Sequence, residues 1–107
     1  MKKVLLLFFL FHINNSIYSQ ENIKKSQIDK VIKTSENYIL KENYNSADSL
    51  LKNIILNSKL VPSEITFLFG KNSFFINKYK QSINWLNKYI EMKGTLGKYS
   101  EEAIKFL

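Results

Sequence analysis

Residues 43–55, NYNSADSLLKNII, return in altered form 35 positions later as residues 78–90, KYKQSINWLNKYI. The same residue types recur at matching places: Tyr44 and Tyr79, Leu51 and Leu86, and Ile55 and Ile90. Self-similarity at a period of 20–50 residues is the signature of a supersecondary unit stacked on its own copy. This repeat therefore decides the fold of the chain.

Apolar residues at helical spacing surround the repeat. The i, i+3, i+4, i+7 rhythm predicts helices in five stretches: residues 28–39, 47–55, 63–76, 83–90 and 99–107. Pro62 marks the boundary before the third helix, and Gly94 suits the C-terminal cap of the fourth. No alternation typical of strands is sustained, so the sequence predicts an all-α chain.

Small residues hold matching places in the two copies. Ser35 and Gly70 lie in the first helix of each unit, and Ala47 and Ser82 follow twelve positions later in the second helix. In an antiparallel helix pair, small side chains equally far from the turn allow the backbones to approach closely where the helices cross. This explains Gly70, because a glycine inside a helix costs about 1 kcal/mol relative to alanine.

The pattern resembles the tetratricopeptide repeat, a helix pair of about 34 residues. The residues that carry the resemblance lie within residues 26–94: Ser35, Tyr38, Tyr44, Ala47, Leu51, Ile54, Phe69, Gly70, Tyr79, Ser82, Leu86 and Tyr89. The resemblance implies antiparallel helix pairs stacked as a short solenoid, with about two repeats and a C-terminal helix.

The resemblance also implies a function in binding proteins or peptides, in a groove lined by the first helix of each unit. The candidate contact residues are Lys30, Lys33, Asn37, Lys71, Asn72 and Phe74. Asn37 and Asn72 coincide at the 35-residue offset, and asparagines in such grooves bind the ligand's backbone. Because at least three units are usually needed, we expect self-association, a bound partner, or continuation of the repeat array.

The chain opens with MKKVLLLFFLFHINNSIYSQ, in which two lysines precede an apolar run and a polar stretch. This order predicts a secretory signal peptide over residues 1–19, cleaved after Ser19, and a helical domain over residues 20–107. The apolar run is shorter than the roughly 20 residues that span a bilayer, so we expect no membrane span after cleavage. The expected location is the periplasm, the cell envelope or the exterior.

Removing 19 of the 107 residues leaves 88, without histidine, cysteine or arginine. Catalytic triads and the usual zinc ligands are then missing, and no glycine-rich phosphate loop is present. We therefore expect no enzyme activity, no catalytic residues, no metal and no cofactor. The fourteen remaining lysines exceed the nine acidic residues by five, but export and the lack of arginine argue against nucleic acid as a partner.

Two functions remain. The first is an exported, non-enzymatic protein interaction module that binds a protein or peptide at the cell envelope. The second is a basic envelope protein that binds an anionic polymer or a membrane surface through its lysines, which salt should weaken steeply.

Within residues 77–90 we expect one apolar stripe to face inward: Tyr79, Ser82, Ile83, Leu86, Tyr89 and Ile90. In the last helix, Ala103, Ile104 and Leu107 share a side. Trp85 flanks the inward stripe, and we predict that it packs on the terminal helix near Phe106 or Leu107. A largely exposed Trp85 would instead be a candidate interface anchor.

Overall fold

The computed structural model describes residues 25–107 of the chain. The chain divides into two compact units, Met1–Lys30 and Val31–Leu107. Of the first unit, only residues 25–30 are described, and they are helical. The predicted signal peptide, residues 1–19, lies outside the described residues.

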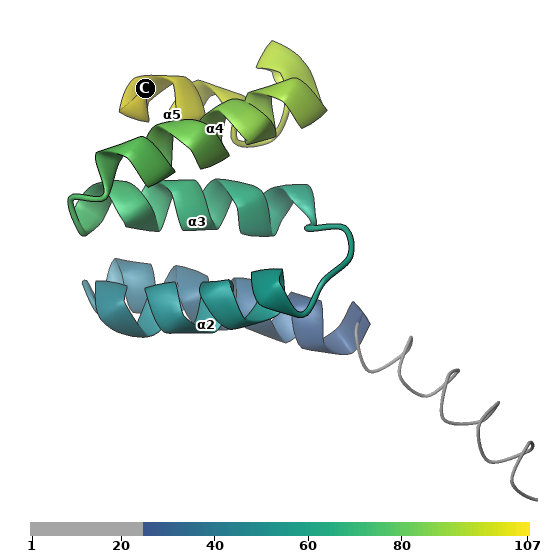
Figure 1. Cartoon of the computed structure of the whole chain (residues 1–107), viewed down its shortest axis with the longest axis vertical. Helices are drawn as coiled ribbons and strands as arrows, with labels where there is room; N and C mark the ends of the chain where they lie inside the picture. The colour runs from purple at the N-terminus through teal and green to yellow at the C-terminus, as the bar shows by residue number, and fades with distance from the viewer. Residues whose placement is uncertain (1–24) are drawn as a thin grey trace, which may run out of the picture. The chain divides into compact units, whose positions relative to one another are not determined.

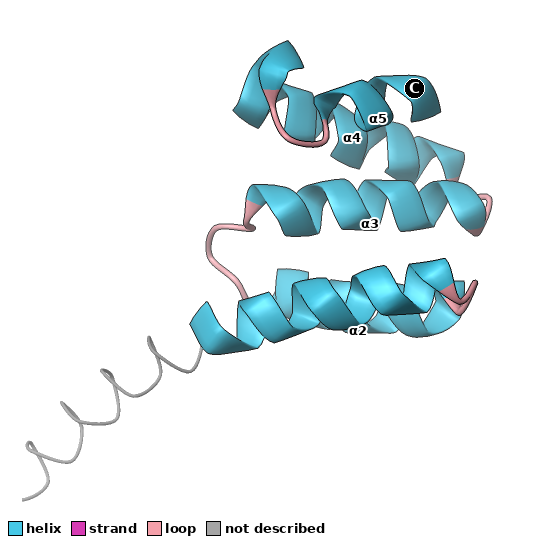
Figure 2. Cartoon of the chain, turned by 180° about the vertical axis from the view of Figure 1, so that it is seen from behind, coloured by secondary structure: helices cyan, strands magenta, loops and turns pink. Residues whose placement is uncertain are grey.

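The second unit consists of helices joined by loops (Figure 2). Its first helix covers residues 31–40. The helices that follow are α2 (Tyr44–Leu56), α3 (Ser63–Phe75), α4 (Tyr79–Lys93), the short 3₁₀ helix η1 (Gly94–Leu96) and α5 (Ser100–Phe106). No strand occurs within residues 25–107. For the described residues the prediction of an all-α fold is confirmed, as is the prediction that Gly94 caps the fourth helix.

Helix α3 is the centre of this unit. It packs against α2, α4 and α5, and Figure 1 shows it between α2 and α4. All residues from Ile65 to Gly70 are buried, as expected for a helix covered on every side. Thr66 and Phe67 lie outside the apolar spacing that predicts this helix, yet both are buried.

The close approach expected at Gly70 is present. A Cβ atom on Gly70 would lie 2.9 Å from Cγ and Cδ2 of Leu86 and 3.0 Å from the Leu86 backbone nitrogen. Glycine therefore lets α3 come close to α4, which explains its place inside a helix. The nearest residue, however, is Leu86 and not the predicted Ser82, so the sequence located the contact one helical turn too early.

The backbone itself repeats after 35 residues at the turns that precede α2 and α4. Glu42 and Asn77 are the two described residues other than glycine with positive φ, 61° and 64°. Asn43 N donates to Tyr38 O and Lys78 N donates to Ser73 O, at 2.8 and 2.9 Å. Glu42 N and Asn77 N donate to the carbonyls of Ile39 and Phe74. Both turns thus form the Schellman motif that ends a helix, without its usual glycine.

Two predicted inward residues are exposed instead. Tyr79 and Ile83 in α4 are 52% and 44% exposed. Within residues 100–107, Ala103 is buried, whereas Ile104 and Leu107, which the sequence placed on the same side, are 50% and 48% exposed. The buried stripe of α4 is narrower than predicted and consists of Ser82, Leu86 and Tyr89. Tyr79 is the first residue of α4 and Ile83 lies beside the buried stripe, so neither is covered on all sides.

Candidate binding pocket

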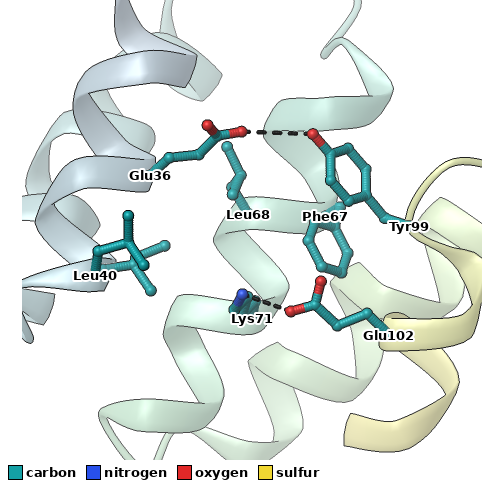
Figure 3. Close-up of a pocket in the computed structure, with 8 residues that line it drawn as sticks. Glu36, Leu40, Phe67, Leu68, Lys71, Tyr99 and Glu102 are labelled. Atoms are coloured by element: carbon teal, nitrogen blue, oxygen red, sulfur yellow. Dashed lines mark hydrogen bonds and ion pairs between the residues drawn. The ribbon is translucent and has the colours of Figure 1, made fainter.

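A pocket of about 230 Å³ opens between the first helix, α3 and the segment that ends in α5. Its apolar wall is made by Ile39, Leu40, Phe67 and Leu68. Its polar rim is made by Glu36, Lys71, Tyr99 and Glu102. Figure 3 shows Glu36 and Leu40 on the first helix, facing Tyr99 and Glu102 across the pocket, with Leu68 and Phe67 between them. The pocket therefore combines an apolar floor with charged groups, the usual composition of a ligand site.

The apolar wall is firmly packed except at its rim. The Phe67 ring stacks on Tyr99, with centroids 4.5 Å apart and planes 5° apart, and tilts against Tyr89 at 5.5 Å. Phe67 and Leu68 are almost completely buried, whereas Leu40 is 83% exposed. A ligand that enters the pocket would therefore cover Leu40 and rest on a fixed floor.

The loop between α4 and α5 fixes Tyr99 in place. Tyr99 N donates a 2.8 Å hydrogen bond to the Tyr89 hydroxyl. Ser100 Oγ accepts from Gly97 N at 2.9 Å and donates to Gly94 O at 2.6 Å. A Cβ atom on Gly97 would lie 2.8 Å from Ser100 Oγ and 2.9 Å from the Tyr89 hydroxyl. Only glycine leaves room for the hydrogen bonds of Tyr89 and Ser100, and together these bonds hold the Tyr99 ring against Phe67.

Two carboxylates face the Tyr99 hydroxyl. Its oxygen lies 3.4 Å from Glu36 Oε1 and 3.5 Å from Glu64 Oε2, and its single proton can serve only one of them at a time. Burial raises the pKa of Tyr99 above its ordinary value and Glu64 and Glu36 raise it further, whereas Lys98 lowers it. The hydroxyl is therefore neutral and a hydrogen-bond donor at neutral pH.

The opposite side of the rim is neutralised. Lys71 Nζ pairs with Glu102 Oε1 at 2.5 Å, which joins α3 to α5. Among residues 25–107, neither Glu36 nor Glu64 takes part in a salt bridge. The rim thus has a neutral side, where Lys71 pairs with Glu102, and an acidic side, where Glu36 and Glu64 face the Tyr99 hydroxyl.

The contact residues predicted from the sequence are scattered. Lys71 lines the pocket. Lys33 and Asn37 are exposed on the first helix but do not line it, and Lys30 is exposed within residues 25–30. Phe74 is half-buried, with ring centroids 5.6 Å from Tyr79.

Asn72 does not fit its predicted role as a surface contact. It is completely buried, and its Nδ2 donates a 2.9 Å hydrogen bond to the backbone oxygen of Tyr44, the first residue of α2. Its amide therefore ties α3 to α2 and is not available to a ligand. Asn37, which matches it in sequence, is exposed, so the two asparagines do not form the predicted pair.

Among the residues assigned to repeat packing, most are buried: Ser35, Ala47, Leu51, Ile54, Phe69, Gly70, Ser82, Leu86 and Tyr89. Tyr38 and Tyr44 are half-buried, and Tyr79 is exposed. The Tyr44 ring stacks on Phe75 with centroids 4.8 Å apart. Tyrosines at the turn end of each unit are thus partly open to solvent.

The predicted contact of Trp85 with the terminal helix is wrong. The half-buried Trp85 meets Phe69 of α3 edge to face at 5.2 Å, and Lys88 Nζ lies 4.5 Å from its ring. Phe106 instead contacts Phe74 and Phe75, at 5.0 and 5.6 Å. Because α5 covers the C-terminal end of α3, its aromatic residue is engaged there.

Sequence reasoning missed Glu36, Tyr99 and Glu102. One signal was available: Glu36 lies 35 positions before Lys71, at the same place in the repeat as the one predicted residue that lines the pocket. Tyr99 and Glu102 carry no such signal, because α5 begins 37 residues after α3, outside the 35-residue register.

Among residues 25–107, no helix combines the length and apolar character needed to cross a membrane. The same residues contain no group of three acidic or histidine side chains arranged to hold a metal ion. Comparisons with models of known protein families, with curated proteins and with solved structures gave no match.

Proposed function

We propose that this chain is an exported, non-enzymatic interaction module that binds a protein or peptide partner in the pocket beside Tyr99. In this account its helices pair in antiparallel fashion and stack as a short solenoid of the tetratricopeptide type. The signal peptide directs the chain to the cell envelope or beyond. The observation that carries the proposal is the origin of the pocket walls: the first helix, α3 and the α5 segment, which are alternate helices along the chain.

Alternate helices share a wall when helix pairs stack in register, because the first helix of each pair then faces the same side. The recurrence of the same turn at Glu42 and Asn77 supports such stacking. So does the glycine contact between α3 and α4 at Gly70. Repeat proteins of this kind use an extended concave surface for binding.

The chemistry of the pocket favours a peptide over a small anionic ligand. An apolar floor of Phe67 and Leu68 suits a side chain, and Leu40 extends the apolar surface beyond the pocket itself. Within residues 25–107, two carboxylates without a salt bridge lie on its acidic side: Glu36 in the pocket lining and Glu64 beside the Tyr99 hydroxyl. An anionic polymer would meet repulsion here, so the lysine-based alternative would have to use another surface.

A selection experiment tests the proposal. Random heptapeptides displayed on phage are selected on the immobilised full chain, and each enriched peptide is titrated into ¹⁵N-labelled chain. We expect enriched peptides to shift the backbone amide signals of Phe67, Leu68 and Tyr99. Absence of enrichment over a blank surface, or shifts confined to other regions, would contradict the proposal.

The anionic alternative has its own measurement. Binding of polyglutamate to the full chain is measured between about 50 and 200 mM salt, the range over which counterion-driven binding weakens strongly. We expect no tight binding. Tight, salt-sensitive binding of polyglutamate together with failure of the peptide selection would favour the basic envelope protein.

A further inference from the structure

We propose that the pocket is specific for a cationic side chain, lysine or arginine, presented by the partner peptide. The aliphatic stem would lie against Leu40 at the mouth of the pocket, and the charged head would lie near Glu36 and Glu64, beside the Tyr99 hydroxyl. This inference rests on the proposed peptide-binding function and adds the chemical class of the bound residue.

The acidic side of the pocket has unused hydrogen-bonding capacity. The distances of 3.4 and 3.5 Å from the Tyr99 hydroxyl to Glu36 and Glu64 exceed the 2.5–3.0 Å of well-formed bonds between oxygens. Each ionised carboxylate has about four acceptor sites. An ammonium or guanidinium group supplies several donors at once, and such charge-assisted bonds are about twice as strong as neutral ones.

The cations already present neutralise this side only in part. Lys71 is engaged by Glu102 at 2.5 Å. Lys98 is exposed and makes no salt bridge with Glu36 or Glu64. Its Nζ lies 5.1 Å from the centroid of the Tyr99 ring, and Tyr99, Glu64 and Glu36 raise the pKa of its ammonium group, so a bound cation would displace a solvent-exposed lysine. Although the whole chain has a net charge of +7, the pocket is locally acidic. It is therefore complementary to a cation and opposed to a carboxylate or phosphate.

The apolar floor selects for a long cationic side chain rather than a free ion. Lysine and arginine bury their methylene stems along apolar surface while the charged head stays at the polar edge. The exposed Leu40 offers that surface at the mouth of the pocket, beside the buried Phe67 and Leu68. A metal ion would leave this apolar wall unused.

Two blocked amino acids distinguish the contribution of the charged head to binding from that of the aliphatic stem. Nα-acetyl-lysine amide and Nα-acetyl-norleucine amide, which lacks the ammonium group, are titrated into ¹⁵N-labelled full chain at low salt. We expect the lysine compound to bind about tenfold more tightly, because hydrogen bonds to charged groups contribute roughly 1.5–3 kcal/mol. Its shifts should centre on Glu36, Leu68 and Tyr99.

Two variants assign the effect to the pocket. Glu36→Gln should weaken lysine amide about fivefold and change norleucine amide by less than twofold. Glu91→Gln is the matched control, since Glu91 is exposed on α4 and does not line the pocket, and it should leave both affinities unchanged.

Each outcome is decisive for the charge preference. Equal affinity for the two compounds would overturn it and leave an apolar peptide site, so the proposed function would still stand. Absence of lysine binding, or shifts away from the pocket, would overturn it as well. The proposed function itself fails only if the phage selection yields no pocket-binding peptide, which is a separate result.

Discussion

Replacing Gly70 by alanine should destabilise the helical unit, although alanine is the better helix former. In α3 the added Cβ atom would lie 2.9 Å from two side-chain atoms of Leu86 and 3.0 Å from its backbone nitrogen. The Leu86 side chain can turn away, but the backbone of α4 can yield only if the helix moves. Leu86 is completely buried, so any movement disturbs the core.

Two opposing terms set the magnitude. The intrinsic preference of a helix for alanine over glycine is worth about 1 kcal/mol. Overpacking of a well-packed core costs typically 1–3 kcal/mol, and the contact with rigid backbone places this site in the upper part of that range. We therefore expect a net loss of about 1–2 kcal/mol in the free energy of unfolding.

Urea unfolding followed by far-UV circular dichroism and by Trp85 fluorescence measures this loss. Ser35→Ala is the matched control, because Ser35 holds the corresponding place in the first helix and already carries a Cβ atom. Its hydroxyl bonds only within its own helix, to Val31 O at 2.6 Å and Ile32 O at 3.1 Å, so we expect a loss below about 1 kcal/mol. A Gly70→Ala variant as stable as the native chain, or more stable, would refute the close approach of α3 and α4.

Three further predictions concern the turns and the pocket. Glu42→Gly should stabilise the chain by about 0.5–1 kcal/mol in urea unfolding, because a left-handed conformation costs most residues roughly 1–2 kcal/mol and glycine very little. Asn77→Gly should stabilise the chain less, since asparagine tolerates this conformation. Equal or reversed effects of the two substitutions would contradict the assigned turns. Gly94→Ala should lower stability by about 1–3 kcal/mol in thermal unfolding, because φ 67° and ψ −159° lie in a region that is essentially restricted to glycine; an unchanged melting temperature would contradict it. The raised pKa of Tyr99 means that the folded chain binds the hydroxyl proton more tightly than the unfolded chain, so the stabilisation present below about pH 10 is lost as pH rises. Between about pH 8 and 11, the free energy of unfolding should therefore fall more steeply for the native chain than for Tyr99→Phe. Parallel declines for the two chains would count against the prediction.

The helices were predictable because the apolar spacing and the boundary residues agree with each other. Ser63 and Gly94 lie at helix ends in the structure, as the sequence indicated. The 35-residue offset also located Gly70 at a helix contact. Burial was less predictable: Tyr79 and Ile83 have the right spacing for an inward face but are exposed, because the position of the neighbouring helices decides which side of α4 is covered, and local pattern does not determine that position.

The pocket was only partly predictable. The choice of the first helix of each unit as the binding side led to Lys71. The offset alone, however, treated Asn37 and Asn72 as equivalent, although Asn72 is used to bond α2 at Tyr44. Tyr99 is held at the pocket by hydrogen bonds of Tyr89 and Ser100. Such contacts between separate segments leave no periodic pattern in the sequence.

The affinity of Leu40→Lys for a phage-selected peptide tests the central claim, that the pocket is where a partner binds. Leu40 is exposed at the rim, four residues after Glu36 on the same helix, so a lysine there can pair with Glu36 and compete with the ligand. Leu60→Lys is the matched control, because Leu60 is 87% exposed and does not line the pocket. We predict that Leu40→Lys weakens peptide binding at least tenfold while Leu60→Lys changes it by less than twofold. Equal affinities for the two variants would contradict the claim.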